Sequence, residues 1–246
     1  MVFYEFKIYG NNFLRYSTTA YYSIDFESYG QSGVLSFLHT LKNNWLSNKE
    51  FDLIDAKNEA RDKVYNFLLD YDREYNITEN MLVCRVPRSK TYFEDSQLYF
   101  QEAINEAIML ANQSLNSRLI DGIEYITRIK DVATTHLSKN RQEDDIMPYP
   151  GITKDTCSIS NEVRGRTILL IDDIYTLGVG VVEDCIQALY DKGARKVIFY
   201  AVGRTKKWGN TLEKEIGGNT ISDIELDDFK APEKIPEIDI DDEIPF

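Results

Sequence analysis

The chain has 246 residues, 43% of them hydrophobic, which suffices for one core domain of about 200 residues with appendages. Its net charge of −13 argues against broad nucleic-acid binding by charge, although it leaves room for a local basic patch. Three cysteines without a Cys-x-x-Cys pair argue against a zinc ribbon and against a disulfide framework.

Hydropathy predicts no membrane span, because no apolar run approaches the roughly 18 residues that a spanning helix needs. The N-terminus, Met1–Lys7, lacks the pattern of a signal peptide. We therefore expect a cytoplasmic protein.

The N-terminal 50 residues are rich in aromatic and β-branched side chains. Partial alternation over residues 2–25 predicts two strands, with a turn at Gly10–Asn12. A short amphipathic helix is expected within Ser32–Trp45. We interpret residues 1–50 as a β-rich extension whose tyrosines form a packed cap, and we assign it no function.

The next elements surround a basic loop. Helical spacing predicts a helix over Asp55–Tyr71, an apolar run predicts a strand over Met81–Val86, and a long helix is expected over Glu94–Asn112. The loop that follows the strand contains Arg88, Ser89 and Lys90. Cations and backbone donors at the end of a buried strand suit a pyrophosphate group. The alternative is an ordinary exposed turn with two basic side chains.

Residues 123–160 have a weaker pattern. Ile123–Ile126 is a short strand candidate, and Arg128–Arg141 is a polar segment with several basic side chains. Asp144–Ser160 contains two prolines, which favours a loop.

The central feature of the chain is a strand that ends in two adjacent carboxylates. Thr167–Ile171 is an apolar run typical of a strand buried in a parallel sheet, and Asp172 and Asp173 follow it. Ligands bind at this end of the strands in open α/β sheets. Behind the acids, the glycine-containing loop Thr176–Gly180 and the amphipathic helix Val181–Tyr190 offer backbone amides to a phosphate. The pattern indicates a ligand that carries sugar hydroxyls beside a phosphate.

Two other interpretations fit this local pattern. The acids could form only the solvated mouth of a sheet, with the glycines serving the turn. An acidic pair also holds magnesium in receiver domains, although there it lies on the first strand rather than far along the chain.

A second buried strand, Lys196–Val202, follows the helix, and Gly193 ends that helix. The strand–helix–strand unit implies a right-handed parallel crossover. We therefore expect an α/β fold with a parallel, Rossmann-like sheet.

The stretch Ile168–Gly180 resembles the phosphoribosyl pyrophosphate (PRPP) signature of type I phosphoribosyltransferases: apolar residues, two acids, two apolar residues and a loop similar to Thr-Thr-Gly-x-Thr. The resemblance implies that Asp172 and Asp173 bind the ribose hydroxyls and act in catalysis. It assigns the 5-phosphate to the loop residues Thr176, Leu177, Gly178, Val179 and Gly180. Leu177 and Gly180 stand where the family usually has threonine or serine, so two hydroxyl donors are missing.

The basic loop extends this resemblance. It implies that Arg88, Ser89 and Lys90 hold the pyrophosphate, and that Mg²⁺ bridges the pyrophosphate and the ribose hydroxyls. No direct protein ligand of the metal is assigned.

The polar segment Arg128–Arg141 resembles the hood of the ComF-like competence branch of the family. This implies that Arg128, Lys139 and Arg141 approach the substrate as the hood closes. His136 stands where that branch usually has glutamine; it is a candidate general base, with an ordinary surface histidine as the alternative. In the family, the region after the second buried strand lies over the acceptor base, so Trp208 could stack on an acceptor or close the sheet edge.

The C-terminal residues 223–246 form an acidic segment with ten acids and two lysines, a composition that predicts disorder. Its last six residues closely resemble the C-terminal tip of bacterial single-stranded DNA-binding protein: Asp241, Asp242, Glu243, Ile244, Pro245 and Phe246. This implies docking on proteins that bind that tip, with the Phe246 ring in an apolar pocket and its carboxylate on an arginine. The alternative is a solubilising tail.

Two hypotheses follow. The first is a phosphoribosyltransferase-like enzyme over residues 51–222 that uses PRPP and Mg²⁺. Its tail would recruit it to replication, repair or recombination proteins, in competence or phage defence. The second is a non-catalytic sensor of PRPP or a related nucleotide, or an adaptor that acts through its tail. The acceptor and any direct nucleic-acid binding are left open, and the resemblance is compatible with a homodimer.

Overall fold

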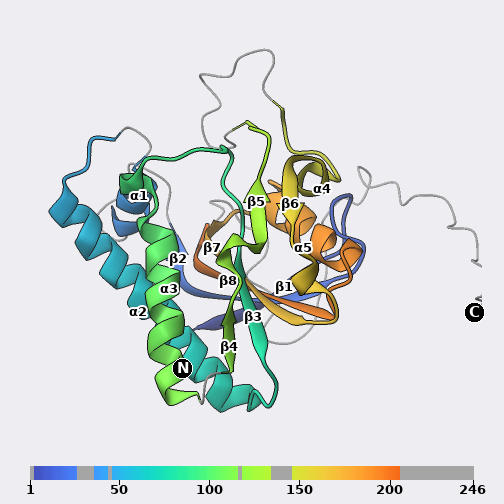
Figure 1. Ribbon diagram of the computed structural model, residues 1–246, viewed down its shortest axis with the longest axis horizontal. Coiled ribbons are helices and arrows are strands. Elements are labelled where there is room, and N and C mark those ends of the chain that lie inside the picture. The colour runs from blue at the N-terminus through green and yellow to red at the C-terminus, as the bar shows by residue number, and fades with distance from the viewer. Residues whose placement is uncertain (1–2, 27–35, 44–45, 116–117, 134–145, 206–246) are drawn as a thin grey trace, which may run out of the picture. The chain divides into compact units, whose positions relative to one another are not determined.

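The computed structural model describes residues 3–26, 36–43, 46–115, 118–133 and 146–205, which all fall within the unit Met1–Lys206. The fold is α/β, and its main sheet has the strand order β1-β2-β8-β7-β3-β4 (Figure 1). The strands of this sheet are β1 (Tyr4–Ile8), β2 (Thr18–Phe26), β3 (Met81–Arg85), β4 (Leu119–Asp121), β7 (Thr167–Tyr175) and β8 (Lys196–Thr205). A two-stranded antiparallel sheet is formed by β5 (Ile126–Arg128) and β6 (Cys157–Ile159).

Helices cover both faces of the main sheet, as the apolar run of β7 predicts. The helices are α1 (Ser36–Lys42), α2 (Glu50–Tyr75), α3 (Tyr99–Ser114), α4 (Ile152–Thr156) and α5 (Val181–Asp191). Short 3₁₀ turns span Asp95–Gln97, Ile123–Tyr125 and Asn161–Val163. Leu169 and Ile171 of β7 pack in one core cluster with α1, α2 and α3, whereas Ile168 and Leu170 pack in the other with α5. Figure 1 shows α2 and α3 together on one side of the sheet and α5 on the other.

The strand order creates a switch point between β3 and β7. These two strands are parallel neighbours, with Arg85 beside Ile171 at the last level of pairing. From β3 the chain runs through α3 to β4, whereas from β7 it runs through α5 to β8, so the two connections leave in opposite directions. In open α/β sheets such a point forms the crevice in which ligands bind.

The two predicted N-terminal strands are confirmed, and they belong to the main sheet. β2 pairs in parallel with β8, and β1 pairs antiparallel with β2 at the sheet edge. Tyr21 and Phe26 of β2 and Leu38 of α1 lie in the same core cluster as α2 and α3. The residues interpreted as an extension therefore share one core with the rest of the described chain.

Two secondary-structure predictions between residues 119 and 160 were wrong. Of the predicted strand Ile123–Ile126, only Ile126 is in a strand, as the first residue of β5, and Ile123–Tyr125 is a 3₁₀ turn. The strand of the main sheet here is β4, which ends before Gly122. A Cβ at Gly122 would lie 2.5 Å from Leu82, so glycine allows the chain to turn close to β3. The predicted loop Asp144–Ser160 contains α4 and β6.

β7 also continues to Tyr175, beyond its apolar run, because β8 pairs with it up to Tyr175.

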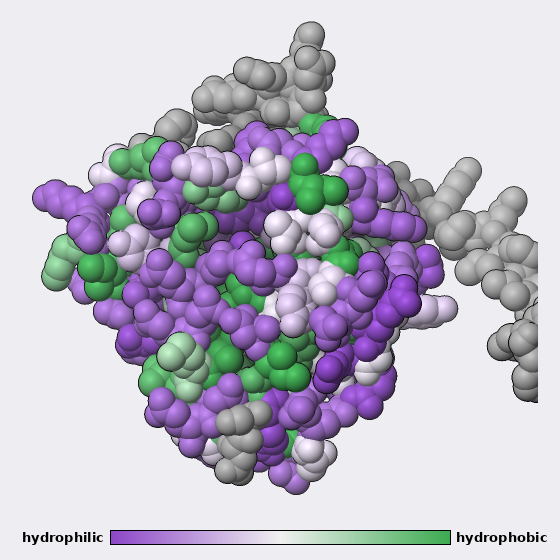
Figure 2. Space-filling model, viewed as in Figure 1, coloured by the Kyte–Doolittle hydropathy of each residue, from purple (hydrophilic) through white to green (hydrophobic). Residues whose placement is uncertain are grey.

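Figure 2 shows a face that is largely hydrophilic, with apolar side chains in small groups. Among the described helices, none has the length and apolar character needed to cross a membrane.

Candidate functional site

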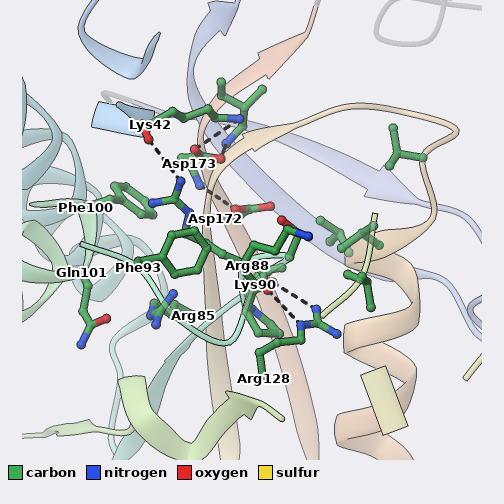
Figure 3. A pocket seen from close by; sticks show the side chains of 18 of the residues that line it. Lys42, Arg85, Arg88, Lys90, Phe93, Phe100, Gln101, Arg128, Asp172 and Asp173 are labelled. Atoms are coloured by element: carbon green, nitrogen blue, oxygen red, sulfur yellow. Dashed lines mark hydrogen bonds and ion pairs between the residues drawn. The ribbon is translucent and has the colours of Figure 1, made fainter. Parts of the chain in front are cut away.

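A cavity of about 350 Å³ lies at the carboxyl ends of β3 and β7, the size of a small-molecule site. It brings together three segments that are far apart in the sequence: the acidic pair on β7, the loop Pro87–Lys90 after β3, and the start of the glycine-containing loop (Figure 3). Side chains from α1, from the segment before α3 and from the first turn of α3 complete its wall, among them Lys42, Phe93, Gln97, Phe100 and Gln101.

The acidic pair is partly buried and held by backbone amides. The Asp172 carboxylate accepts a hydrogen bond of 2.9 Å from the Asp173 amide, and the Asp173 carboxylate accepts one of 2.7 Å from the Ile174 amide. Asp173 also forms an ion pair of 3.4 Å with Lys42, which α1 supplies. Burial raises the pKa of Asp172 well above its usual range; the adjacent Asp173 charge adds to this, and Lys42 opposes it.

Arginine side chains fix the backbone of the basic loop. The Arg88 guanidinium donates to the main-chain oxygens of Gln97 at 2.6 Å and Lys42 at 3.1 Å, and it lies 4.1 Å from the centre of the Phe93 ring. Arg128 is buried in β5 and donates to the main-chain oxygens of Arg88 at 2.9 Å and Pro87 at 3.4 Å. The predicted hood residue Arg128 therefore lines the cavity as an anchor of the loop.

The segment after β5 also holds the basic loop. The Val132 amide donates to the main-chain oxygen of Ser89 at 2.8 Å, and the Lys90 ammonium lies 3.6 Å from an Asp131 carboxylate oxygen. Asp131 in turn accepts from the amide and hydroxyl of Thr91. These bonds join the basic loop and the base of the predicted hood into one unit.

The glycine-containing loop enters the cavity only in part. Thr176 and Val179 line it, whereas Leu177 and Gly178 are exposed and lie outside its lining. Thr176 shares a hydrogen bond of 2.8 Å with the Thr205 hydroxyl. Gly180 is buried with φ +82°, and a Cβ there would lie 2.6 Å from the ring of Phe13. Phe13, in the loop between β1 and β2, thus occupies the space that a hydroxyl-bearing side chain at position 180 would need.

A buried carboxyl group stands behind this loop. Glu183, in the first turn of α5, is 1% exposed and lines the cavity. One of its oxygens accepts a 2.9 Å hydrogen bond from the Tyr175 hydroxyl, and the other has no partner among the described residues. Burial raises the pKa of Glu183, and the hydrogen bond from Tyr175 opposes this shift.

Basic groups outnumber acidic ones around the cavity. Five cationic side chains line it, against the three carboxylates Asp172, Asp173 and Glu183; the cations are Lys42, Arg85, Arg88, Lys90 and Arg128. In a chain of net charge −13 this is a local positive site, and it favours an anionic ligand.

Several predicted site residues lie outside the described residues. These are His136, Lys139 and Arg141 of the polar segment, Trp208, and the whole tail that ends in Asp241–Phe246. Among the described residues, no three His, Cys, Asp or Glu side chains come together as a metal-binding group.

Sequence analysis missed Lys42, Arg85, Phe93 and Glu183 as residues of this cavity. Arg85 carried a signal, since it is a charged residue at the end of the otherwise apolar strand run Met81–Val86. Lys42 carried none, because only the packing of α1 against the core brings it to Asp173.

No protein-family model matches this chain, and no curated protein matches it either.

Proposed function

We propose that the cavity binds PRPP or a related nucleotide and that the protein acts as a Mg²⁺-dependent phosphoribosyltransferase. The observation that carries the proposal is the convergence of the acidic pair, the basic loop and the glycine-containing loop on one cavity at the switch point of the sheet. Carboxylates suit sugar hydroxyls, and cations with backbone donors suit phosphates, so the two walls match the two halves of such a ligand.

In this proposal the ribose lies over the acidic pair. Asp172 and Asp173 accept hydrogen bonds from its hydroxyls and stabilise the positive charge that develops at the anomeric carbon. The pyrophosphate leaves toward the basic loop, whose backbone Arg88 and Arg128 hold in place. The 5-phosphate lies at Thr176 and Val179, before the N-terminus of α5.

Magnesium would arrive bound to the ligand phosphates. Mg²⁺ is usually held by one or two carboxylates together with substrate phosphates, and Asp172 and Asp173 fit that donor set. Its charge would neutralise the leaving pyrophosphate.

The test is calorimetric titration of PRPP with MgCl₂ into the wild type and into the double variant Asp172→Asn, Asp173→Asn. We expect binding by the wild type and none by the double variant, because the amides remove both charges that face the sugar and the metal. Glu59→Gln, on the exposed side of α2, is the matched control and should bind as the wild type does. Absence of wild-type binding at millimolar ligand contradicts the proposal.

The second candidate function, a non-catalytic sensor of the same ligand, has its own support. Phe13 packs against Gly180 where a side chain would lie, and Leu177 is exposed outside the cavity, so neither position supplies a hydroxyl donor. Both features reduce the donors available to a 5-phosphate, which affects turnover more than binding. A sensor binds PRPP as above but releases no pyrophosphate with any acceptor.

We also propose that residues 241–246 recruit the protein to partners of the bacterial single-stranded DNA-binding protein tip. This part is supported by the sequence of the tail alone. Fluorescence anisotropy of a labelled Asp241–Phe246 peptide with such a partner tests it, and a peptide without Phe246 should lose binding.

A further inference from the structure

Among the described residues, three arginines line the cavity, and two of them are committed to the main chain. Arg88 donates to the carbonyl oxygens of Gln97 and Lys42, and Arg128 donates to those of Arg88 and Pro87 and to the Thr156 hydroxyl. In Figure 3 dashed lines run from both of these side chains. Their donors maintain the shape of the basic loop and are largely used before any ligand arrives.

Arg85 differs from both. It is the last residue of β3, and its backbone is fixed by pairing beside Ile171 of β7. Its guanidinium makes no hydrogen bond or ion pair with any described residue, and its Nε is enclosed without a partner. Figure 3 draws it at the cavity wall without a dashed line.

The surroundings of Arg85 are unfavourable for an unpaired cation. Burial lowers the pKa of Arg85, and the charges of Glu124 and Asp172 oppose that effect from beyond ion-pair distance. Glu124 instead accepts a hydrogen bond from Gln101. Enclosing a guanidinium without an acceptor costs free energy, which is recovered when an anion binds to it.

The two lysines of the cavity are not unpaired cations of this kind. Lys42 is paired with Asp173 and Lys90 with Asp131. Of the five cations that line the cavity, only Arg85 makes no side-chain hydrogen bond or ion pair with a described residue.

We propose that Arg85 binds the pyrophosphate group of the ligand through the planar fork of its guanidinium. The fork presents parallel N–H donors to two oxygens of one phosphate group, a geometry that an ammonium does not offer. Arg85 ends β3 two residues before the basic loop Pro87–Lys90 and lines the same cavity, on the side to which the proposed function directs the leaving pyrophosphate. The inference rests on the proposed function for the ligand's identity, but it names a residue of the anion site that neither the basic loop nor the hood contains.

Titration of inorganic pyrophosphate with MgCl₂ tests the assignment. We expect Arg85→Gln to weaken binding by about 10- to 100-fold, since charge-assisted hydrogen bonds are lost. Arg85→Lys should recover only part of this loss, because it restores the charge without the fork. Neither variant should melt below the wild type, since the Arg85 guanidinium bonds to no described residue and its enclosure costs free energy.

A matched control removes one positive charge elsewhere. Lys154→Gln changes an exposed lysine of α4 that lies outside this cavity, and it should leave pyrophosphate affinity unchanged. Wild-type affinity in Arg85→Gln, or no pyrophosphate binding by the wild type at millimolar concentration, overturns the inference. Arg85-dependent binding of pyrophosphate without binding of PRPP supports the inference and contradicts the proposed function, so the two failures are distinguishable.

Discussion

The two walls of the cavity differ in how their charged side chains are satisfied. On the β3 side, Arg88 and Arg128 donate to main-chain carbonyls, and the loop that they hold has its geometry set by many bonds. On the β7 side, the adjacent carboxylates of Asp172 and Asp173 lie together in a partly buried place, and Glu183 is enclosed with one oxygen unpartnered.

This difference indicates a division between stability and ligand binding. Charges that bond to the backbone strengthen the fold, because their loss leaves buried carbonyls without donors. Charged groups that are buried without enough hydrogen-bond or ion-pair partners destabilise the fold. Such groups are typical of sites where a bound ligand supplies the missing partners. Replacing a backbone-bound arginine such as Arg128 should therefore lower the free energy of unfolding, whereas replacing Asp172 should raise it.

The largest effect is expected for Arg128→Ala. It removes the donors of two loop carbonyls and of Thr156, which should cost about 3–5 kcal/mol and lower the melting temperature by about 2–4 °C per kcal/mol. Thermal unfolding followed by circular dichroism measures the loss. The comparison variant is Arg85→Ala: the Arg85 guanidinium lines the same cavity but bonds to no described residue, so its removal should not lower the melting temperature. Equal losses in the two variants contradict the division between the walls.

A smaller loss is expected for Gly180→Ala. The new methyl group meets the Phe13 ring at 2.6 Å in a backbone conformation with φ +82°, and the two effects together should cost about 2–4 kcal/mol. Gly178→Ala is the matched control: its φ is +88°, but no atom lies within 4 Å of the added Cβ, so only the backbone strain of about 1–2 kcal/mol applies. Urea denaturation of both variants measures the difference. If Phe13 does not occupy this place, the two glycines should respond alike.

Much of the cavity was predictable from local sequence patterns. The acidic pair follows an apolar strand run, and the basic loop follows another, so parallel pairing of the two strands was enough to bring them together. The α/β class followed from the same alternation of strands and helices.

The rest depended on packing between distant segments, which no local pattern contains. Gly180 was interpreted as a lost hydroxyl donor, whereas the structure gives it a steric reason in Phe13, 167 residues earlier in the chain. Arg128 was assigned to a hood that approaches the substrate, whereas its side chain is buried against the loop carbonyls. The partners of a strand-end side chain depend on how distant segments pack around it, and a single sequence does not specify that packing.

The smallest effect, and the one of opposite sign, is expected for Asp172→Asn. The raised pKa means that the folded protein binds the Asp172 proton more tightly than the unfolded chain does. The corresponding stabilisation is fully present below the unfolded pKa of about 4 and is lost as pH rises through the folded pKa. Asparagine stays neutral and can still accept from the Asp173 amide, so the variant should be more stable than the wild type at pH 8, by about 1 kcal/mol or more.

The pH dependence separates this cause from a general effect of the substitution. The advantage of Asp172→Asn in melting temperature should shrink as pH falls from 8 to about 4, where the wild-type carboxyl is also protonated. Asp55→Asn, which changes an exposed carboxylate on α2, is the matched control. A variant that is less stable than the wild type at pH 8, or a difference that does not change with pH, would mean that Asp172 is well accommodated in the folded protein. The β7 wall would then stabilise the fold as the β3 wall does, and the contrast between them would be lost.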